Sequence, residues 1–90
     1  LAGRDPAVAE RYRTDRRALR GELERLIAEH AGRWGVGKNF DARRLATSLA
    51  ALISGLAVEH SVDPEEIDEG VIADAVSELF AGAIARTHLD

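Results

Sequence analysis

The central helix of this chain is expected within residues 41–60, which read DARRLATSLAALISGLAVEH. Its large apolar residues recur with the 3.6-residue period of a helix, at Leu45, Leu49, Leu52, Ile53 and Leu56. Asp41 is suited to the N-cap position, because its carboxylate can accept a hydrogen bond from a free backbone N–H of the first turn. The pattern predicts a helix over residues 42–60.

The other side of this helix carries small or uncharged residues, and no charged residue stands between Leu45 and Val58. A helix that is apolar or small all round is buried on two sides, and small residues let a second helix approach closely. A chain of 90 residues is too short to cover one helix twice. We therefore expect a second copy of the chain to provide the missing cover, in a two-fold homodimer.

Two further helices are predicted, over residues 6–31 and 65–87. Asp5-Pro6 marks the start of the first helix, and the glycines that follow Ala31 mark its end. Asp63-Pro64, with Glu66 in the third position of a capping box, predicts the start of the last helix. Because no stretch alternates with the period of a strand, the predicted fold is all-α, with one domain spanning residues 1–90.

The last helix also has an apolar surface wider than the stripe of about 100° that one-sided burial requires. We expect antiparallel contacts between the last two helices of both copies, with Gly55 at a close helix crossing. The residues predicted to form the dimer interface are Leu49, Ala51, Leu52, Ser54, Gly55, Val58, Val76, Leu79, Phe80, Ala83 and Ile84.

Composition narrows the compartment and the partners. The chain has no cysteine, which fits a reducing, cytoplasmic environment. The apolar run 45–58 is expected to be too short, and too rich in serine, threonine and glycine, to span a membrane. Residues 1–44 carry 11 basic and 7 acidic side chains, whereas residues 45–90 carry 1 and 9. The basic half is therefore interpreted first as a complement to the acidic half, within the chain or across a dimer.

Three motifs suggest other functions and fail in context. Residues 32–38 fit the Gly-x-x-x-x-Gly-Lys part of a phosphate loop, but Asn39 replaces the metal-binding hydroxyl residue and no strand precedes them. The glycine turn after His30 resembles part of a helix-turn-helix, but residues 33–40 cannot form its recognition helix. Trp34 and Phe40 are instead expected to pin this loop to the core. The sequence predicts neither a catalytic site nor a cofactor.

No metal site is predicted either. The three histidines, His30, His60 and His88, each lie in or beside the last turn of a predicted helix. A cation there complements the negative end of the helix dipole. We therefore expect the histidines to act at helix ends rather than as metal ligands.

The chain resembles the C-terminal part of a TetR/AcrR-type transcriptional repressor over nearly its whole length. The resemblance rests on the segment RDPAVAERY at residues 4–12, the segment LAALISGLA at residues 49–57 and a final helix that begins at a proline. Ser54 departs from the family pattern, which usually has aspartate at that position. The resemblance implies that the last two helices of two subunits form a four-helix bundle. It also implies an N-terminal helix-turn-helix domain for DNA and an effector pocket between the two parts.

The expected function is therefore the dimerisation and ligand-sensing domain of a TetR-like repressor, without its DNA-binding domain and without enzyme activity. The resemblance implies a small-molecule effector, and Tyr12 and Arg16 are candidates to face it because they lie on the core-facing side of the first helix. The expected partners are a second copy of the chain, this effector and, through the absent N-terminal domain, DNA. The alternative is a stand-alone helical module for protein–protein interaction.

Overall fold

The structure is a computed structural model, and it describes residues 5–89. Three α-helices account for most of this part: α1 (Pro6–His30), α2 (Ala42–Val62) and α3 (Glu69–Arg86). A single 3₁₀ turn, η2 (Ala31–Arg33), follows α1. Because the described residues contain no strand, the all-α prediction is confirmed.

The starts of α1 and α2 lie where the sequence predicts them. The Asp5 carboxylate accepts hydrogen bonds from the N–H groups of Ala7 and Val8, at 2.9 and 3.4 Å, and Pro6 is the first residue of α1. The Asp41 carboxylate accepts a bond from the N–H of Arg44 at 3.0 Å, which caps α2. Both aspartates are extended and satisfy free donors of the first turn, as N-cap residues do.

The start of α3 differs from the prediction. The helix begins at Glu69 after the N-cap Asp68, whose carboxylate accepts a bond from the N–H of Val71 at 2.9 Å. Asp63 instead ends α2, because its N–H still donates to the Glu59 carbonyl, while its carboxylate caps only a short turn through the N–H of Glu66. Asp63 and Asp68 are both suited to an N-cap. Because α2 extends to Val62, Asp63 serves as its C-cap, and Asp68 is the N-cap of α3.

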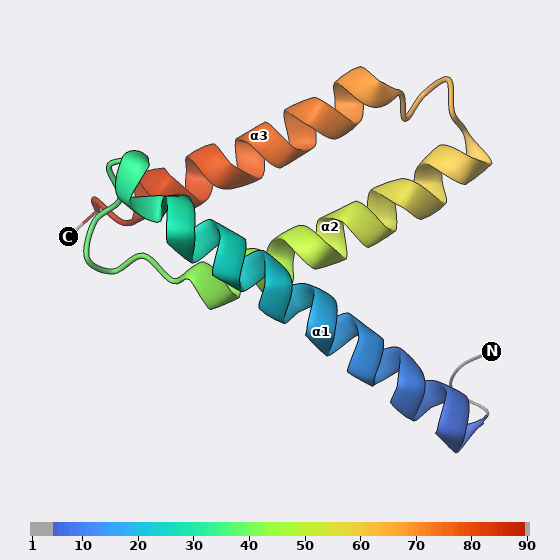
Figure 1. The fold of residues 1–90 in the computed structure, drawn as a ribbon. Coiled ribbons are helices and arrows are strands. Elements are labelled where there is room, and N and C mark those ends of the chain that lie inside the picture. Colours follow the sequence, from blue (N-terminus) through green and yellow to red (C-terminus); the bar gives the residue numbers. More distant parts are fainter. Residues whose placement is uncertain (1–4, 90) are drawn as a thin grey trace.

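The core lies where α1 crosses the first half of α2. Its buried residues are Ile27, Ala31, Leu45, Ala46, Leu49 and Ala50. Figure 1 shows α2 and α3 antiparallel and joined by a turn at one end, with α1 crossing α2 near its start. The N-terminal half of α1 then diverges from α2 (Figure 1).

The loop between η2 and α2 is held by aromatic contacts. Trp34 makes edge-to-face contacts with Phe40, at 6.3 Å between ring centroids, and with Phe80, at 5.6 Å. Both distances lie in the range that favours aromatic pairs. Trp34 and Phe40 therefore pin the loop to the core, as predicted, and Trp34 also ties it to α3.

The chain is extended for its length. Its Cα radius of gyration is 15.4 Å, whereas a compact domain of this size has about 12 Å. Its accessible surface is 6704 Å², whereas a folded monomer of this mass exposes about 5,100 Å². No residue of α3 is buried. The layer formed by α2 and α3 is thus covered only in part, by α1.

Candidate dimer interface

One side of α2 is exposed along its whole length. The exposed residues recur at intervals of three and four, which places them on one face of the helix: Arg44, Ser48, Ala51, Gly55, Val58 and Val62. Only Arg44 is charged, and Val58 is 61% exposed. An ideal Cβ on Gly55 would meet no atom beyond its own neighbouring helix backbone within 4 Å. This face of α2 has no cover within the described residues.

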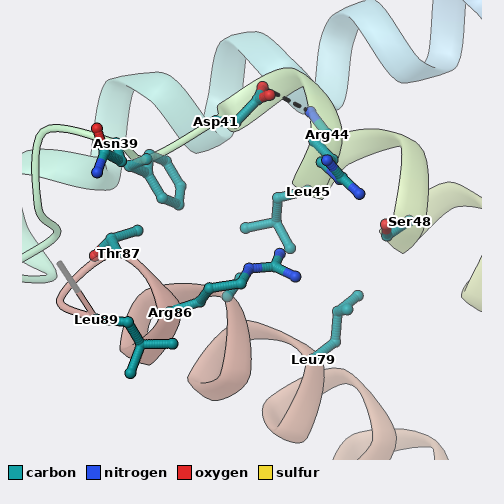
Figure 2. Close-up of a pocket in the computed structure, with 11 residues that line it drawn as sticks. Asn39, Asp41, Arg44, Leu45, Ser48, Leu79, Arg86, Thr87 and Leu89 are labelled. Carbon is teal, nitrogen blue, oxygen red and sulfur yellow. Dashed lines mark hydrogen bonds between the residues drawn. The ribbon is translucent and has the colours of Figure 1, made fainter.

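A groove joins this side of α2 to one side of α3. The groove has a volume of about 610 Å³, and Arg44, Ser48, Leu79 and Arg86 are among its lining residues. Figure 2 shows the two arginines reaching into the same space from opposite walls, Arg44 from α2 and Arg86 from α3. Its apolar lining consists of Phe40, Leu45, Leu79, Ala83 and Leu89. The groove therefore shows which sides of the two helices form one continuous surface.

Continuing from Leu79 and Arg86 at helical intervals adds three small or apolar residues of α3 to this surface: Val71, Ala75 and Gly82. Like Gly55, Gly82 has open space around it within the chain. We call this surface the open face, and it consists of Arg44, Ser48, Ala51, Gly55, Val58, Val62, Val71, Ala75, Leu79, Gly82 and Arg86.

The residues predicted for the interface divide into several groups. Ala51, Gly55, Val58 and Leu79 lie on the open face. Leu49 is only 7% exposed and packs in the core of the single chain. Three others are half-buried and pack against that core, as Leu79 also does: Val76, Phe80 and Ala83. Leu52, Ser54 and Ile84 are half-buried.

Sequence reasoning missed Ser48, Val62, Val71, Ala75 and Gly82 as members of this surface. Ser48 and Gly82 escape a search for apolar stripes because their side chains are short or absent. Val62 lies beyond the predicted end of its helix at residue 60, and Val71 lies one helical turn before Ala75, at the edge of the apolar set of α3. The signal that could have found them is the repeat of small residues at intervals of three and four.

The candidate effector residues do not line the groove. The Arg16 guanidinium is half-buried and donates a hydrogen bond to the Ala50 carbonyl oxygen at 3.0 Å. Tyr12 is 56% exposed on the diverging half of α1, one helical turn before Arg16. In this structure Arg16 therefore joins α1 to α2, whereas Tyr12 remains open to a ligand or a partner.

Charge pairing is confined to α1 within the described residues. Three ion pairs are present: Glu10 with Arg13 at 2.7 Å, Glu22 with Arg25, and Arg25 with Glu29 at 2.7 Å. A hydrogen bond from Arg25 and its positive charge hold the pKa of Glu22 below its ordinary value. No ion pair in residues 5–89 joins the basic half of the chain to the acidic half. The predicted complement between halves is therefore not made as ion pairs within this part.

The glycine loop does not form a phosphate cradle. The N–H of Gly37 donates to the Thr87 hydroxyl oxygen at 2.8 Å, so this backbone donor already has a partner in α3's C-cap residue. His88 donates from Nε2 to the Gly35 carbonyl at 2.7 Å, and the loop is thus fastened at two points. The loop serves to connect α2 to the end of α3.

The other two histidines also contact backbone carbonyls. Nδ1 of His30 bonds the Leu26 carbonyl at 2.8 Å, within the last turn of α1, and Nδ1 of His60 bonds the Ile67 carbonyl at 2.6 Å. His60 and His88 thus fasten neighbouring segments as well as lying near helix ends. Residues 5–89 contain no group of three or more side chains that could hold a metal ion.

By length and composition alone, α2 could span a membrane. Its 21 residues have a mean hydropathy of 1.4 in the most apolar window. The sequence prediction that this segment is too short rested on residues 45–58, and the helix proves longer. However, α2 supplies four of the six buried core residues, Leu45, Ala46, Leu49 and Ala50. The core helix of a water-soluble protein has the same composition, so this feature is weak support for a membrane span.

Comparison with known proteins gives one match. The family described as BetI-type transcriptional repressor, C-terminal, matches residues 1–85. Neither a curated protein nor a solved structure gives a significant match to the chain. The matched range contains the central helix and nearly all of α3. The chain therefore belongs to the family of C-terminal domains of BetI-type transcriptional repressors, within the wider group of TetR-type regulators.

Proposed function

We propose that this chain is the dimerisation and ligand-sensing domain of a TetR-like transcriptional repressor, and that two copies associate through the open face. In this proposal α2 and α3 of both copies form a four-helix bundle in the cytoplasm. A small-molecule effector is sensed by the full-length protein. DNA is bound by a helix-turn-helix domain outside this chain.

The observation that carries the proposal is the uncovered surface of the α2–α3 layer. The surface of 6704 Å² exceeds that of a compact monomer of this mass by about 1,600 Å². Because the diverging half of α1 shares this excess, a dimer through the α2–α3 layer would bury at most about 3,200 Å² in total, within the size range of obligate homodimers. The open face is apolar or small between the arginines at one end and Val62 and Val71 at the other. It can therefore pack tightly against a second copy.

The effector side is proposed on α1. Val8, Tyr12 and Leu19 are all exposed and lie on one side of the helix, at intervals of four and seven residues. Of the two candidate effector residues, Tyr12 belongs to this stripe, and its side chain is exposed. We propose that this stripe faces the remaining helices of the regulatory domain and the effector between them.

Gly55 provides the experiment that tests dimerisation through the open face. Gly55→Ala raises helix propensity by about 1 kcal/mol and adds one methyl group. Gly55→Leu gains propensity too, but its bulk at a close crossing costs about 1–3 kcal/mol. We expect the leucine variant to weaken the dimer, measured as its dissociation constant by sedimentation equilibrium. A leucine variant as dimeric as the parent would remove Gly55 from the interface.

A matched control lies on α1. Gly21 is also helical and exposed, and a Cβ there would meet no other atom within 4 Å. It lies outside the open face, so Gly21→Leu should leave the dimer dissociation constant unchanged while gaining the same propensity. Comparison of the two leucine variants separates interface packing from helix propensity.

The alternative, a stand-alone module for another protein, uses the same open face. It predicts a monomer at micromolar concentration that dimerises only weakly. The same sedimentation experiment on the unmodified chain distinguishes the two functions.

A further inference from the structure

The α2–α3 layer has one basic and one acidic end. At the groove end stand Arg43, Arg44 and Arg86, where α2 begins and α3 ends, together with Asp41, whose carboxylate caps α2. At the other end, six acidic residues surround the turn between the helices: Glu59, Asp63, Glu65, Glu66, Asp68 and Glu69. Residues 59–69 contain no lysine or arginine, and their one histidine, His60, is hydrogen-bonded to the Ile67 carbonyl.

These charges find no opposite partner within the described chain. All three ion pairs of residues 5–89 lie on α1, and none involves α2 or α3. The two ends are separated by the length of α2, which for its 21 residues is about 31 Å. This separation exceeds the screening length of about 8 Å at physiological salt, so the two ends cannot neutralise each other within one copy.

A two-fold dimer through the open face has two simple arrangements. If the two-fold axis runs along the helices, the acidic turns of both copies lie at the same end of the bundle, and so do both groups of arginines. If the axis runs across the helices, each acidic turn lies beside the partner's groove. The small residues Ala51 and Gly55 lie near the middle of α2 and suit either crossing. Apolar packing alone therefore does not choose between the arrangements, whereas charge does.

We propose the second arrangement, in which the two-fold axis runs across the helices and the two copies lie in opposite directions, or head to tail, across the open face. The acidic turn of each copy then lies at the groove of the other, between Arg44 and Arg86. This orientation rests on the proposed dimer. It specifies how the two copies are arranged and places the partner's acidic turn in the groove. The groove of about 610 Å³ between Arg44 and Arg86 receives carboxylates from the partner's turn. Glu65 and Glu66 are suited to this role because both are exposed and neither side chain is ion-paired in residues 5–89.

Charges at the rim of an interface contribute orientation and specificity more than affinity. Exposed pairs each stabilise by a small amount, but juxtaposed like charges destabilise the wrong arrangement. The head-to-tail arrangement also gives the acidic turn, whose side chains make no ion pair in the described part of the chain, a basic neighbour. The complement lies in the other copy.

Replacing acidic residues of the turn with neutral ones tests the arrangement, because the two arrangements predict opposite changes in the dimer dissociation constant. In the head-to-tail dimer, Glu65→Gln with Glu66→Gln removes attraction at both symmetric ends and should raise the dimer dissociation constant about threefold to tenfold. In the opposite arrangement the same change relieves repulsion and lowers the constant. Raising salt from about 50 to 500 mM should likewise weaken a head-to-tail dimer. A lower or unchanged constant in either experiment overturns the proposed arrangement.

A control of equal charge change is available on α1. Asp15→Asn with Glu24→Gln also removes two negative charges, and neither residue takes part in an ion pair in the described structure. This control should leave the dissociation constant within about twofold of the parent. An effect as large as that of the turn variant would show that net charge, not the turn, controls association, and would overturn the proposal.

Charge reversal supplies an independent test. Arg44→Glu with Arg86→Glu should weaken the dimer about tenfold, and adding Glu65→Arg with Glu66→Arg in the same chain should restore it. In the opposite arrangement neither step changes the sign of any contact, so no weakening and no rescue would occur. Circular dichroism of each variant confirms that it is folded. A chain that is monomeric at all salt concentrations contradicts the proposed function itself, whereas a dimer without weakening and rescue contradicts only its orientation.

Discussion

Gly37 and Thr87 join the loop before α2 to the end of α3. The N–H of Gly37 donates to Oγ1 of Thr87 at 2.8 Å, and this hydroxyl in turn donates to the Ile84 carbonyl at 2.7 Å. A Cβ on Gly37 would lie 2.4 Å from the Thr87 carbonyl oxygen. The contact closes one end of the α2–α3 layer and positions the loop that forms a wall of the groove.

Gly37→Ala should therefore destabilise the chain. The added methyl group meets backbone rather than a flexible side chain, so the loop and α3 must separate, at a cost of about 1–3 kcal/mol. Gly32→Ala is the control, because a Cβ on Gly32 meets open space. Urea unfolding at one fixed protein concentration measures both variants. Equal stability of the two variants would show that the loop does not press against Thr87.

Arg16→Ala should lower stability more than Arg17→Ala. Arg16 is half-buried and donates to the Ala50 carbonyl, whereas Arg17 is exposed. The loss of this charged hydrogen bond, discounted for exposure, should cost about 1 kcal/mol. The comparison of melting temperatures measures the difference. If Arg17→Ala lowers the melting temperature as much, Arg16 does not connect α1 to α2 through this bond.

The helices could be predicted from the sequence because their signals are local. Aspartate caps, Pro6 and the apolar period fix α1 and the start of α2 without reference to the rest of the chain. The start of α3 could not be fixed in this way, because Asp63 and Asp68 both satisfy the rule for an N-cap. Only the bond from the Asp63 N–H to the Glu59 carbonyl shows that Asp63 is the C-cap of α2.

The covered and open sides of α2 were harder to predict. The apolar period places Ile53 with the leucines, yet Ile53 is 45% exposed, while Ala46 and Ala50 are each 1% exposed. The reason is the path of α1, which crosses α2 near its start and then diverges from it (Figure 1), so that the later part of α2 has less cover. Which side of a helix is buried depends on where its neighbour crosses, and the sequence of that helix alone does not contain this information.

The ion pairs on α1 predict a pH effect at one residue. Because Arg25 lowers the pKa of folded Glu22, Glu22 contributes stability at pH values above its unfolded-state pKa of about 4.3. This contribution is lost as the pH falls through the lower folded value. A carboxyl NMR titration should show the pKa of Glu22 rising when Arg25 is changed to glutamine. An unchanged pKa in Arg25→Gln would show that the pair does not persist in solution.

The chain should not bind duplex DNA with sequence specificity. Its net charge is −4, and the glycine-rich segment 32–39 contains only a 3₁₀ turn where a recognition helix would be required. The arginines of α1 allow only weak, salt-sensitive contact with phosphates. In a gel shift at physiological salt, two unrelated duplexes should bind equally. Discrimination by tenfold, about 1.4 kcal/mol, would contradict this expectation.

In the proposed dimer, a second copy of the chain covers the open face of α2 and α3. Light scattering coupled to gel filtration tests it most directly, at micromolar concentration and physiological salt. We expect a single species with twice the chain mass of 9.7 kDa. A monodisperse species of 9.7 kDa would contradict it, because the open face would then remain exposed to water in the functional protein.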